Sequence, residues 1–109
     1  MKLKQTILAA ALTALASSAA LADITIGVSL PLTGPASGLG IPVNQQMKLW
    51  PATIGGEKIK LIILDDATDP TNGTKIAKRF VTDDKVDIII GSVATPVAIP
   101  IADVAAESQ

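Results

Sequence analysis

The chain has 109 residues, a formal net charge of −1 at pH 7, and neither cysteine nor histidine. Those absences remove zinc sites of the usual kind and the common histidine- or cysteine-based catalysts, so we expect neither enzymatic activity nor a bound cofactor. Trp50 and Phe80 are the only aromatic residues and no basic patch is present, which argues against nucleic acid as a partner.

Residues 1–22 have the features of a secretory signal peptide. Lys2 and Lys4 supply a positive start, residues 7–16 are apolar apart from one threonine, and residues 20–22 form a small-x-small cleavage pattern. An uncleaved membrane anchor is the alternative, although a span needs roughly 20 apolar residues and polar residues interrupt this stretch. We therefore expect an exported protein.

The remaining segment, residues 23–109, is smaller than the usual domain of about 100–150 residues. A chain of this size buries only about 60–65% of its unfolded surface. Small exported domains usually compensate with disulfides, which a sequence without cysteine cannot form. We therefore expect residues 23–109 to be part of a larger folded unit.

The first predicted element is a strand over residues 23–30. Apolar side chains alternate along it and share one face: Ile24, Ile26, Val28 and Leu30. Residues 31–40 are dense in glycine and proline and predict a loop. This loop is either a plain connection or a ligand loop, since ligands bind beyond the carboxyl ends of parallel strands.

A short helix is predicted over residues 41–51, ending at its proline. Its apolar residues recur at helical spacing: Val43, Met47 and Trp50. We interpret Trp50 as a packing residue on this helix rather than as a platform for a ligand. A turn over residues 54–57 leads to the second predicted strand, residues 59–64.

An acidic loop follows the second strand and contains Asp65, Asp66 and Asp69. Three carboxylates could bind a hard cation, but the glycine and distal glutamate of an EF-hand loop are missing, and we expect no metal. Asp69 before Pro70 predicts an N-cap and first residue for a helix that runs to residue 83 or 84. Asp65 and Asp66 either cap backbone amides or face a cleft.

Residues 86–90 form an apolar run that predicts the third strand. Gly91 to Pro96 then predicts a loop that opens a helix, with Thr95 as N-cap and Pro96 as first residue. Backbone N–H groups at such a helix start favour an anion such as a carboxylate. If the helix begins nearer Pro100, Pro96 belongs to the loop, and the sequence leaves both possibilities open.

The strand–helix alternation predicts an α/β fold, a three-layer parallel sheet with helices on both faces. The expected local strand order is 2-1-3. In that order, the loops at the carboxyl ends of the strands meet at one edge: residues 31–40, 65–69 and 91–96.

Three stretches carry a family resemblance: residues 24–35 (ITIGVSLPLTGP), 65–70 (DDATDP) and 91–96 (GSVATP). With the exported start, they resemble the N-terminal part of the periplasmic substrate-binding proteins of branched-chain (leucine/isoleucine/valine-type) amino-acid ABC transporters. The resemblance covers nearly all of residues 23–109. It implies a periplasmic binding protein type I fold of two lobes, of which this segment is a partial N-terminal lobe, about a quarter to a third of the whole.

The resemblance also implies a role and a site. Such proteins bind an amino acid or related carboxylate in the periplasm and deliver it to an inner-membrane ABC permease, without catalysis. The loop after the third strand would hold the ligand carboxylate, which maps to Thr95 with Ala94 and Pro96 beside it. The loop after the first strand would contact the ligand side chain, which maps to Ser37 and chiefly Leu39. Many relatives carry an aromatic residue near the Leu39 position.

Two other functions remain open from the sequence. A ligand-sensing receptor ectodomain shares the same fold. A receiver-like signalling module would use Asp65 and Asp66 as an acidic metal pocket, but receivers are cytoplasmic and place their acidic pair after the first strand.

Overall fold

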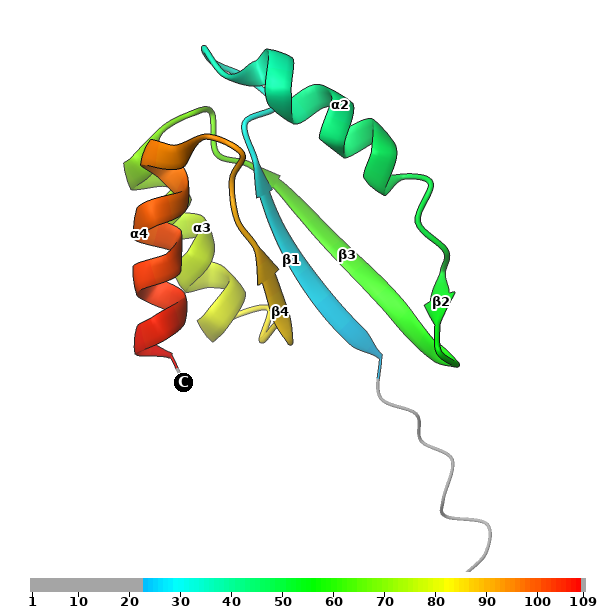
Figure 1. The fold of residues 1–109 in the computed structure, drawn as a ribbon. Helices are drawn as coiled ribbons and strands as arrows, with labels where there is room; N and C mark the ends of the chain where they lie inside the picture. The colour runs from blue at the N-terminus through cyan, green and yellow to red at the C-terminus, as the bar shows by residue number, and fades with distance from the viewer. Residues whose placement is uncertain (1–22, 109) are drawn as a thin grey trace, which may run out of the picture.

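The computed structural model describes residues 23–108, and the predicted signal peptide lies outside this range. The chain alternates strands and helices in the expected manner (Figure 1). The elements are β1 (Ile24–Leu30), α2 (Ser37–Met47), β2 (Thr53–Ile54), β3 (Glu57–Asp65), α3 (Pro70–Thr82), β4 (Ile88–Ile90) and α4 (Thr95–Glu107). No helix within residues 23–108 is long and apolar enough to cross a membrane.

The sheet has the strand order β2-β3-β1-β4, with β1 in parallel pairing with both β3 and β4. The predicted 2-1-3 order of the three main strands is therefore confirmed. The short strand β2, which the sequence analysis did not identify, pairs antiparallel with β3. Gly55 and Gly56 join them with φ angles of 59° and 85°, as a two-residue hairpin requires.

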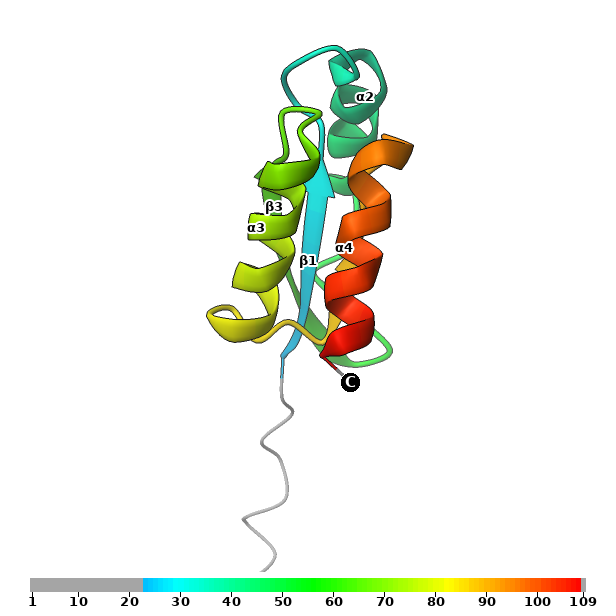
Figure 2. The same cartoon turned by 90° about the vertical axis from the view of Figure 1, so that its left-hand side faces the viewer.

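Helices cover both faces of the sheet, as predicted. α3 and α4 lie side by side on one face, and α2 lies on the other (Figures 1 and 2). Because successive strand residues point to opposite faces, side chains of β1 pack against the helices on both sides of the sheet. Val28 packs in the same buried cluster as Met47 of α2. Gly27 lies directly under the buried ring of Phe80 of α3.

α2 begins at Ser37, so the prediction of a loop as far as Gly40 and a helix from Ile41 is wrong. Glycines and an internal proline, Pro42, make this stretch a poor helix by local propensity. Packing supplies the reason for the glycine at position 40. A Cβ there would collide with the backbone oxygen of Pro31, so a glycine allows the first turn of α2 to lie against the end of β1.

α3 begins as predicted. The Asp69 carboxylate accepts hydrogen bonds from the N–H groups of Thr71 (2.8 Å) and Asn72 (3.4 Å), and Pro70 is the first helical residue. The carboxylate therefore caps two of the amides that a helix start leaves without partners.

α4 runs from Thr95 to Glu107 and contains Pro100, which settles the alternative that the sequence left open. The N-cap is Ala94, without a side-chain cap bond, so the prediction of Thr95 as N-cap is wrong by one residue.

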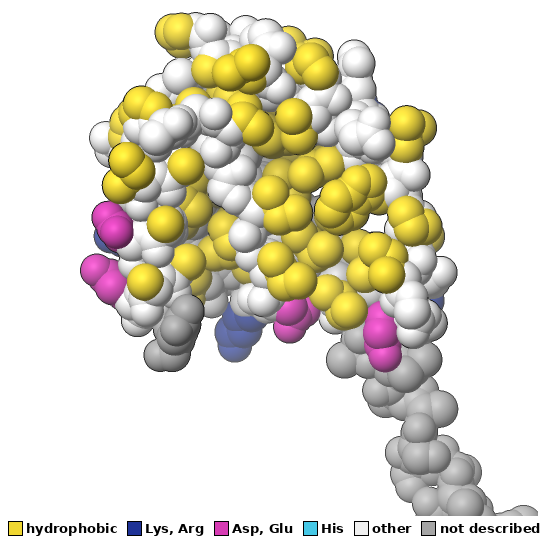
Figure 3. Space-filling model, viewed as in Figure 1, with side chains coloured by type: hydrophobic (Ala, Val, Ile, Leu, Met, Phe, Trp, Pro, Cys, Tyr) yellow, Lys and Arg dark blue, Asp and Glu magenta, His cyan; other side chains and the backbone are white. Residues whose placement is uncertain are grey.

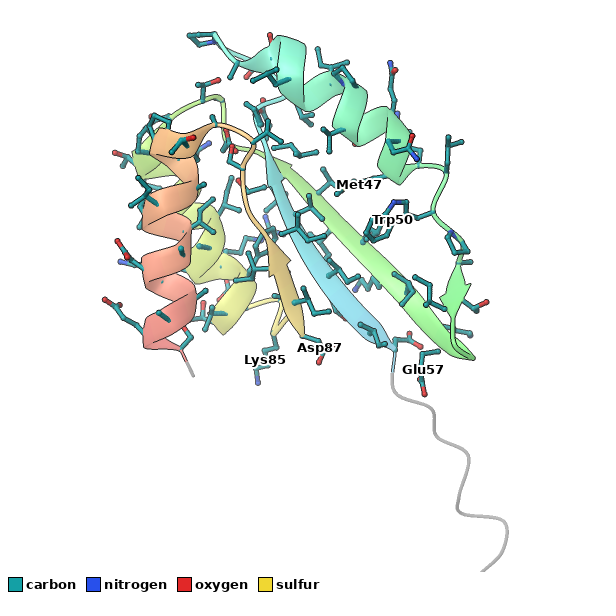
Figure 4. All side chains as sticks on the ribbon, viewed as in Figure 1. Met47, Trp50, Glu57, Lys85 and Asp87 are labelled. Carbon is teal, nitrogen blue, oxygen red and sulfur yellow. The ribbon has the colours of Figure 1, made fainter. Side chains whose placement is uncertain are left out.

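The third predicted strand, β4, is shorter than expected, because it begins at Ile88. Before β4, Asp87 (labelled in Figure 4) is hydrogen-bonded to β1. Its N–H donates to the Thr25 oxygen and its carboxylate accepts from the Thr25 N–H, each at 2.8 Å.

The sheet face under α2 is only partly covered. Trp50 was predicted to pack on the helix, but α2 ends at Met47 and Trp50 lies beyond it, 36% exposed (Figure 4). Ile88 at the sheet edge is 50% exposed. Apolar side chains are consequently visible across this face of the molecule (Figure 3).

Candidate ligand-binding edge

The loops that follow β1, β3 and β4 meet at one end of the sheet, which we call the carboxyl edge (Figure 1). These loops comprise residues 31–36, 66–69 and 91–94. In open parallel sheets, this edge is where ligands bind. All five residues predicted for a ligand site lie in or directly after these loops.

Asp65, the last residue of β3, ties the first two loops together. Its carboxylate accepts hydrogen bonds from the Thr33 hydroxyl (2.7 Å) and from the N–H groups of Leu32 (2.8 Å), Ala67 (2.8 Å) and Thr33 (3.2 Å). Burial acts to raise the pKa of Asp65, but these hydrogen bonds outweigh it and hold the pKa below the usual value for aspartate.

Asp66 is fully buried and has a structural role. Its carboxylate accepts from the Ser29 hydroxyl and from the Thr68 N–H, each at 2.9 Å. Of the two roles considered for Asp65 and Asp66, the structure therefore shows capping of backbone and hydroxyl donors. Within residues 23–108, no cluster of three histidine, cysteine or acidic side chains is placed to hold a metal ion.

Thr68 completes the connection between these loops. Its hydroxyl donates to the Thr33 oxygen (3.2 Å) and accepts from the Ala36 N–H (3.1 Å). Gly34, with φ of 81°, approaches so closely that a Cβ would collide with the backbone oxygen of Ala67. The sequence analysis missed Thr33 and Thr68, because both act through contacts more than 30 residues apart in the chain. The only local sign was their place beside the glycine and the aspartates.

Ser37 and Leu39 lie in the first turn of α2, rather than in the loop where they were predicted. Ala36 is the N-cap and makes no side-chain cap bond. Ser37 is half-buried, whereas the Leu39 side chain is 59% exposed at the carboxyl edge. Leu39 therefore offers an apolar surface that no other part of residues 23–108 covers.

The start of α4 contributes the other three predicted residues. Ala94 is buried, while Thr95 and Pro96 are exposed in the first turn. The Ser92 hydroxyl, which the sequence analysis did not single out, accepts from the Ala94 N–H at 3.1 Å. The Thr95 hydroxyl makes no hydrogen bond to any residue in the described part of the chain.

The starts of α2 and α4 are neighbours. Ala36 packs against the buried cluster formed by Ala77, Ala94, Val97 and Ile101. Two helix N-termini, each carrying a partial positive charge, therefore lie at the same edge of the sheet. Such an arrangement favours the carboxylate of a ligand over a cation.

Two hollows of the described structure lie beside β4, and one of them reaches Gly91, the first residue of the loop that follows this strand. Each measures about 440 Å³; one lies at the opposite end of β4 beside Lys85 and Asp87, and the other lies between β4 and α4 beside Ala98 and Ala102. Neither includes a predicted site residue. Leu39, Thr95 and Pro96 are all exposed at the carboxyl edge, so a ligand bound there would need a second covering surface.

Asp65 should make stability depend on acid pH. A carboxyl whose pKa is lowered by folding stabilises the protein above its unfolded-state pKa, and this contribution is lost as the pH falls through the folded-state value. We expect the free energy of unfolding, measured in urea, to fall more steeply between about pH 5 and pH 2 in the wild type than in Asp65→Asn. Equal slopes in the two proteins would show that the Asp65 hydrogen bonds do not hold its carboxylate ionised.

Comparison with known proteins identifies relatives across the described fold. A family model described as periplasmic binding protein matches residues 23–109. Leu/Ile/Val-binding protein homolog 3 of Brucella melitensis is 40% identical over 98 residues, covering 84% of this chain and 26% of the relative. An extracellular ligand-binding receptor from Rhodopseudomonas palustris is 47% identical, with a TM-score of 0.78 over 80% of this chain and 24% of that structure.

A further solved relative is a complex with a small aromatic acid. The solute-binding protein of an ABC transporter from Rhodopseudomonas palustris BisB5, in complex with 3,4-dihydroxy benzoic acid, is 30% identical to this chain. Its TM-score is 0.70, over 78% of this chain and 24% of that structure. The chain thus spans about a quarter of the length of each of these relatives.

Proposed function

The chain belongs to the periplasmic binding protein family, and on this basis we propose that it supplies part of the first lobe of a solute-binding component of an ABC importer. The family match confirms the resemblance seen in the sequence. The proposed role is to bind a small carboxylate ligand in the periplasm and deliver it to an inner-membrane permease, without catalysis. The predicted signal peptide supports export, and the solute-binding relatives support a non-enzymatic role.

The main structural support for this proposal is that the N-termini of α2 and α4 both lie at the carboxyl edge. The Thr95 hydroxyl, which has no hydrogen-bond partner among residues 23–108, and the first turn of α4 would hold the ligand carboxylate, with Ala94 and Pro96 shaping the contact. Leu39 and Ser37, in the first turn of α2, would contact the rest of the ligand. The exposed side chains at this edge and the partly uncovered apolar sheet face both support a second lobe in the whole protein.

A branched-chain amino acid is our first choice of ligand. The three loops contain neither lysine nor arginine, and this suits a small zwitterion better than a phosphate. The Leu/Ile/Val-binding relatives support the same choice. The ligand ammonium would need acceptors from elsewhere in the whole protein, because Asp65 and Asp66 are already occupied by hydrogen bonds.

An aromatic acid is the second candidate, supported by the relative bound to 3,4-dihydroxy benzoic acid. Both ligands present a carboxylate beside an apolar group, so both fit Thr95 and Leu39. A sensing ectodomain of the same fold is a further alternative, supported by the likeness to an extracellular ligand-binding receptor from Rhodopseudomonas palustris. Ligand binding is common to both roles, and uptake of labelled ligand by cells with and without the gene separates them.

Thr95→Val is expected to weaken ligand binding about tenfold in the full-length protein, because it removes one hydrogen bond to a charged group. Isothermal titration calorimetry with leucine, isoleucine, valine and 3,4-dihydroxybenzoate measures the affinity and identifies the preferred ligand. Since the Thr95 hydroxyl has no partner within the described residues, the melting temperature without ligand should not change.

Thr71→Val is the matched control, because Thr71 is another exposed threonine in the first turn of a helix beside the same edge. Its affinity should equal that of the wild type. Unchanged affinity in Thr95→Val would remove Thr95 from the site. A full-length protein that shows no thermal shift with any of these ligands would contradict the proposed function itself, since ligand binding to the native state raises its stability.

A further inference from the structure

Asn72 is followed by glycine, whereas the other asparagine of the chain, Asn44, is followed by glutamine. An asparagine side chain can be attacked by the backbone nitrogen of the next residue. Glycine hinders this attack least, because it has no Cβ beside the nitrogen. In an unfolded chain, Asn72–Gly73 is therefore the more reactive of the two positions toward deamidation.

The fold restrains both reacting groups. The Asn72 side-chain nitrogen donates to the backbone oxygen of Asp65 at 3.1 Å, which fixes the amide across the start of α3. The Gly73 N–H, whose nitrogen would be the nucleophile, donates to the Asp69 oxygen at 2.9 Å. Gly73 is also buried against α4, where a Cβ would lie 2.5 Å from a methyl carbon of Val97.

We propose that Asn72–Gly73 is a deamidation site at which the native packing of α3 slows the reaction. We further propose that deamidation of Asn72 destabilises the carboxyl edge. In the first step, the Gly73 nitrogen bonds to the Asn72 Cγ, the bond from Cγ to Nδ2 breaks, and ammonia leaves with the Gly73 proton. In the second step, water opens the resulting succinimide at either carbonyl. The product is aspartate or isoaspartate, and no oxidant or reductant takes part.

The product would disturb the edge through Asp65. A carboxylate at position 72 cannot donate to the Asp65 oxygen, so the bond that holds the end of β3 to α3 is replaced by repulsion. The Asp69 carboxylate already lies at this helix start, 3.4 Å from the Asn72 N–H. A second negative charge therefore gains little from the helix dipole. Isoaspartate would in addition lengthen the backbone within the first turn of α3.

The protein is incubated in mildly alkaline buffer with and without urea, and deamidation is measured over time by peptide mass spectrometry. This experiment tests whether the native fold protects Asn72. We expect conversion at Asn72 to be at least about tenfold slower without urea, because reaction must await local opening of α3. In urea, Asn72 should react faster than Asn44, which serves as an internal reference. Equal rates at Asn72 with and without urea would overturn the proposal.

Asn72→Asp mimics the aspartate product and tests the consequence of the added charge. We expect it to lower the melting temperature by about 4 °C or more, while Asn44→Asp in α2 leaves it nearly unchanged. Asn44 makes no side-chain hydrogen bond within the described residues, so it controls for the added charge. An Asn72→Asp protein as stable as the wild type would show that the bond to Asp65 does not hold the edge.

Discussion

Gly40→Ala is expected to destabilise the protein by about 3 kcal/mol, toward the upper end of what overpacking costs. The added Cβ would collide with the backbone oxygen of Pro31, and this oxygen belongs to the chain that leaves the central strand β1. A flexible side chain could rotate away from such a contact, but a backbone oxygen moves only with its strand. The first turn of α2 must therefore shift or unwind.

Gly38→Ala is the matched control in the same helical turn. A Cβ at Gly38 meets nothing within 4 Å, so alanine there should stabilise the helix by about 0.5–1 kcal/mol. Urea unfolding of the wild type and both variants measures the difference. A Gly40→Ala protein as stable as Gly38→Ala would mean that α2 does not lie against the end of β1 as described.

The same pair of variants bears on the ligand site. Ser37 and Leu39 share the first turn of α2 with Gly40, so displacement of this turn moves both proposed contacts. Under the proposed function, Gly40→Ala should lose ligand affinity as well as stability, whereas Gly38→Ala should lose neither.

Sequence patterns within single helices and strands predicted most of the fold correctly. Apolar runs of branched residues located β1, β3 and β4, and the Asp69–Pro70 pair located the start of α3, because these signals lie within the elements themselves. The strand order followed from the alternation of strands and helices and from the handedness of crossovers.

Features set by contacts distant in the chain could not be predicted in this way. The start of α2 depends on the approach of Gly40 to Pro31, so local propensity alone indicated a loop. The roles of Asp65 and Thr68 depend on partners in the loop after β1. The sequence did place the candidate site residues at the carboxyl edge, where the structure has them. It did not show which of their polar groups lack a partner among residues 23–108.

Phe80→Ala is expected to have the largest effect on stability, a loss of about 3–5 kcal/mol in the free energy of unfolding. The Phe80 ring is fully buried between α3 and the sheet. Its ring carbons would lie 2.7–2.9 Å from a Cβ on Gly27, so the ring fills the space that this glycine of the central strand leaves open. Such a loss is a large share of the roughly 5–15 kcal/mol that holds a typical domain folded.

A double-mutant cycle with Gly27→Ala separates this packing from a general loss of apolar surface. Gly27→Ala alone should destabilise, because its methyl group collides with the Phe80 ring. In the Phe80→Ala background, the same methyl group enters the vacated space and replaces a glycine within a strand, so its cost should vanish or become a gain. Additive effects in urea unfolding would contradict the contact between Gly27 and Phe80. Coupling of the expected sign would instead show that Gly27 of β1 and the Phe80 ring of α3 stabilise the fold as a pair, which fixes α3 and therefore the Asp65 loop against the central strand.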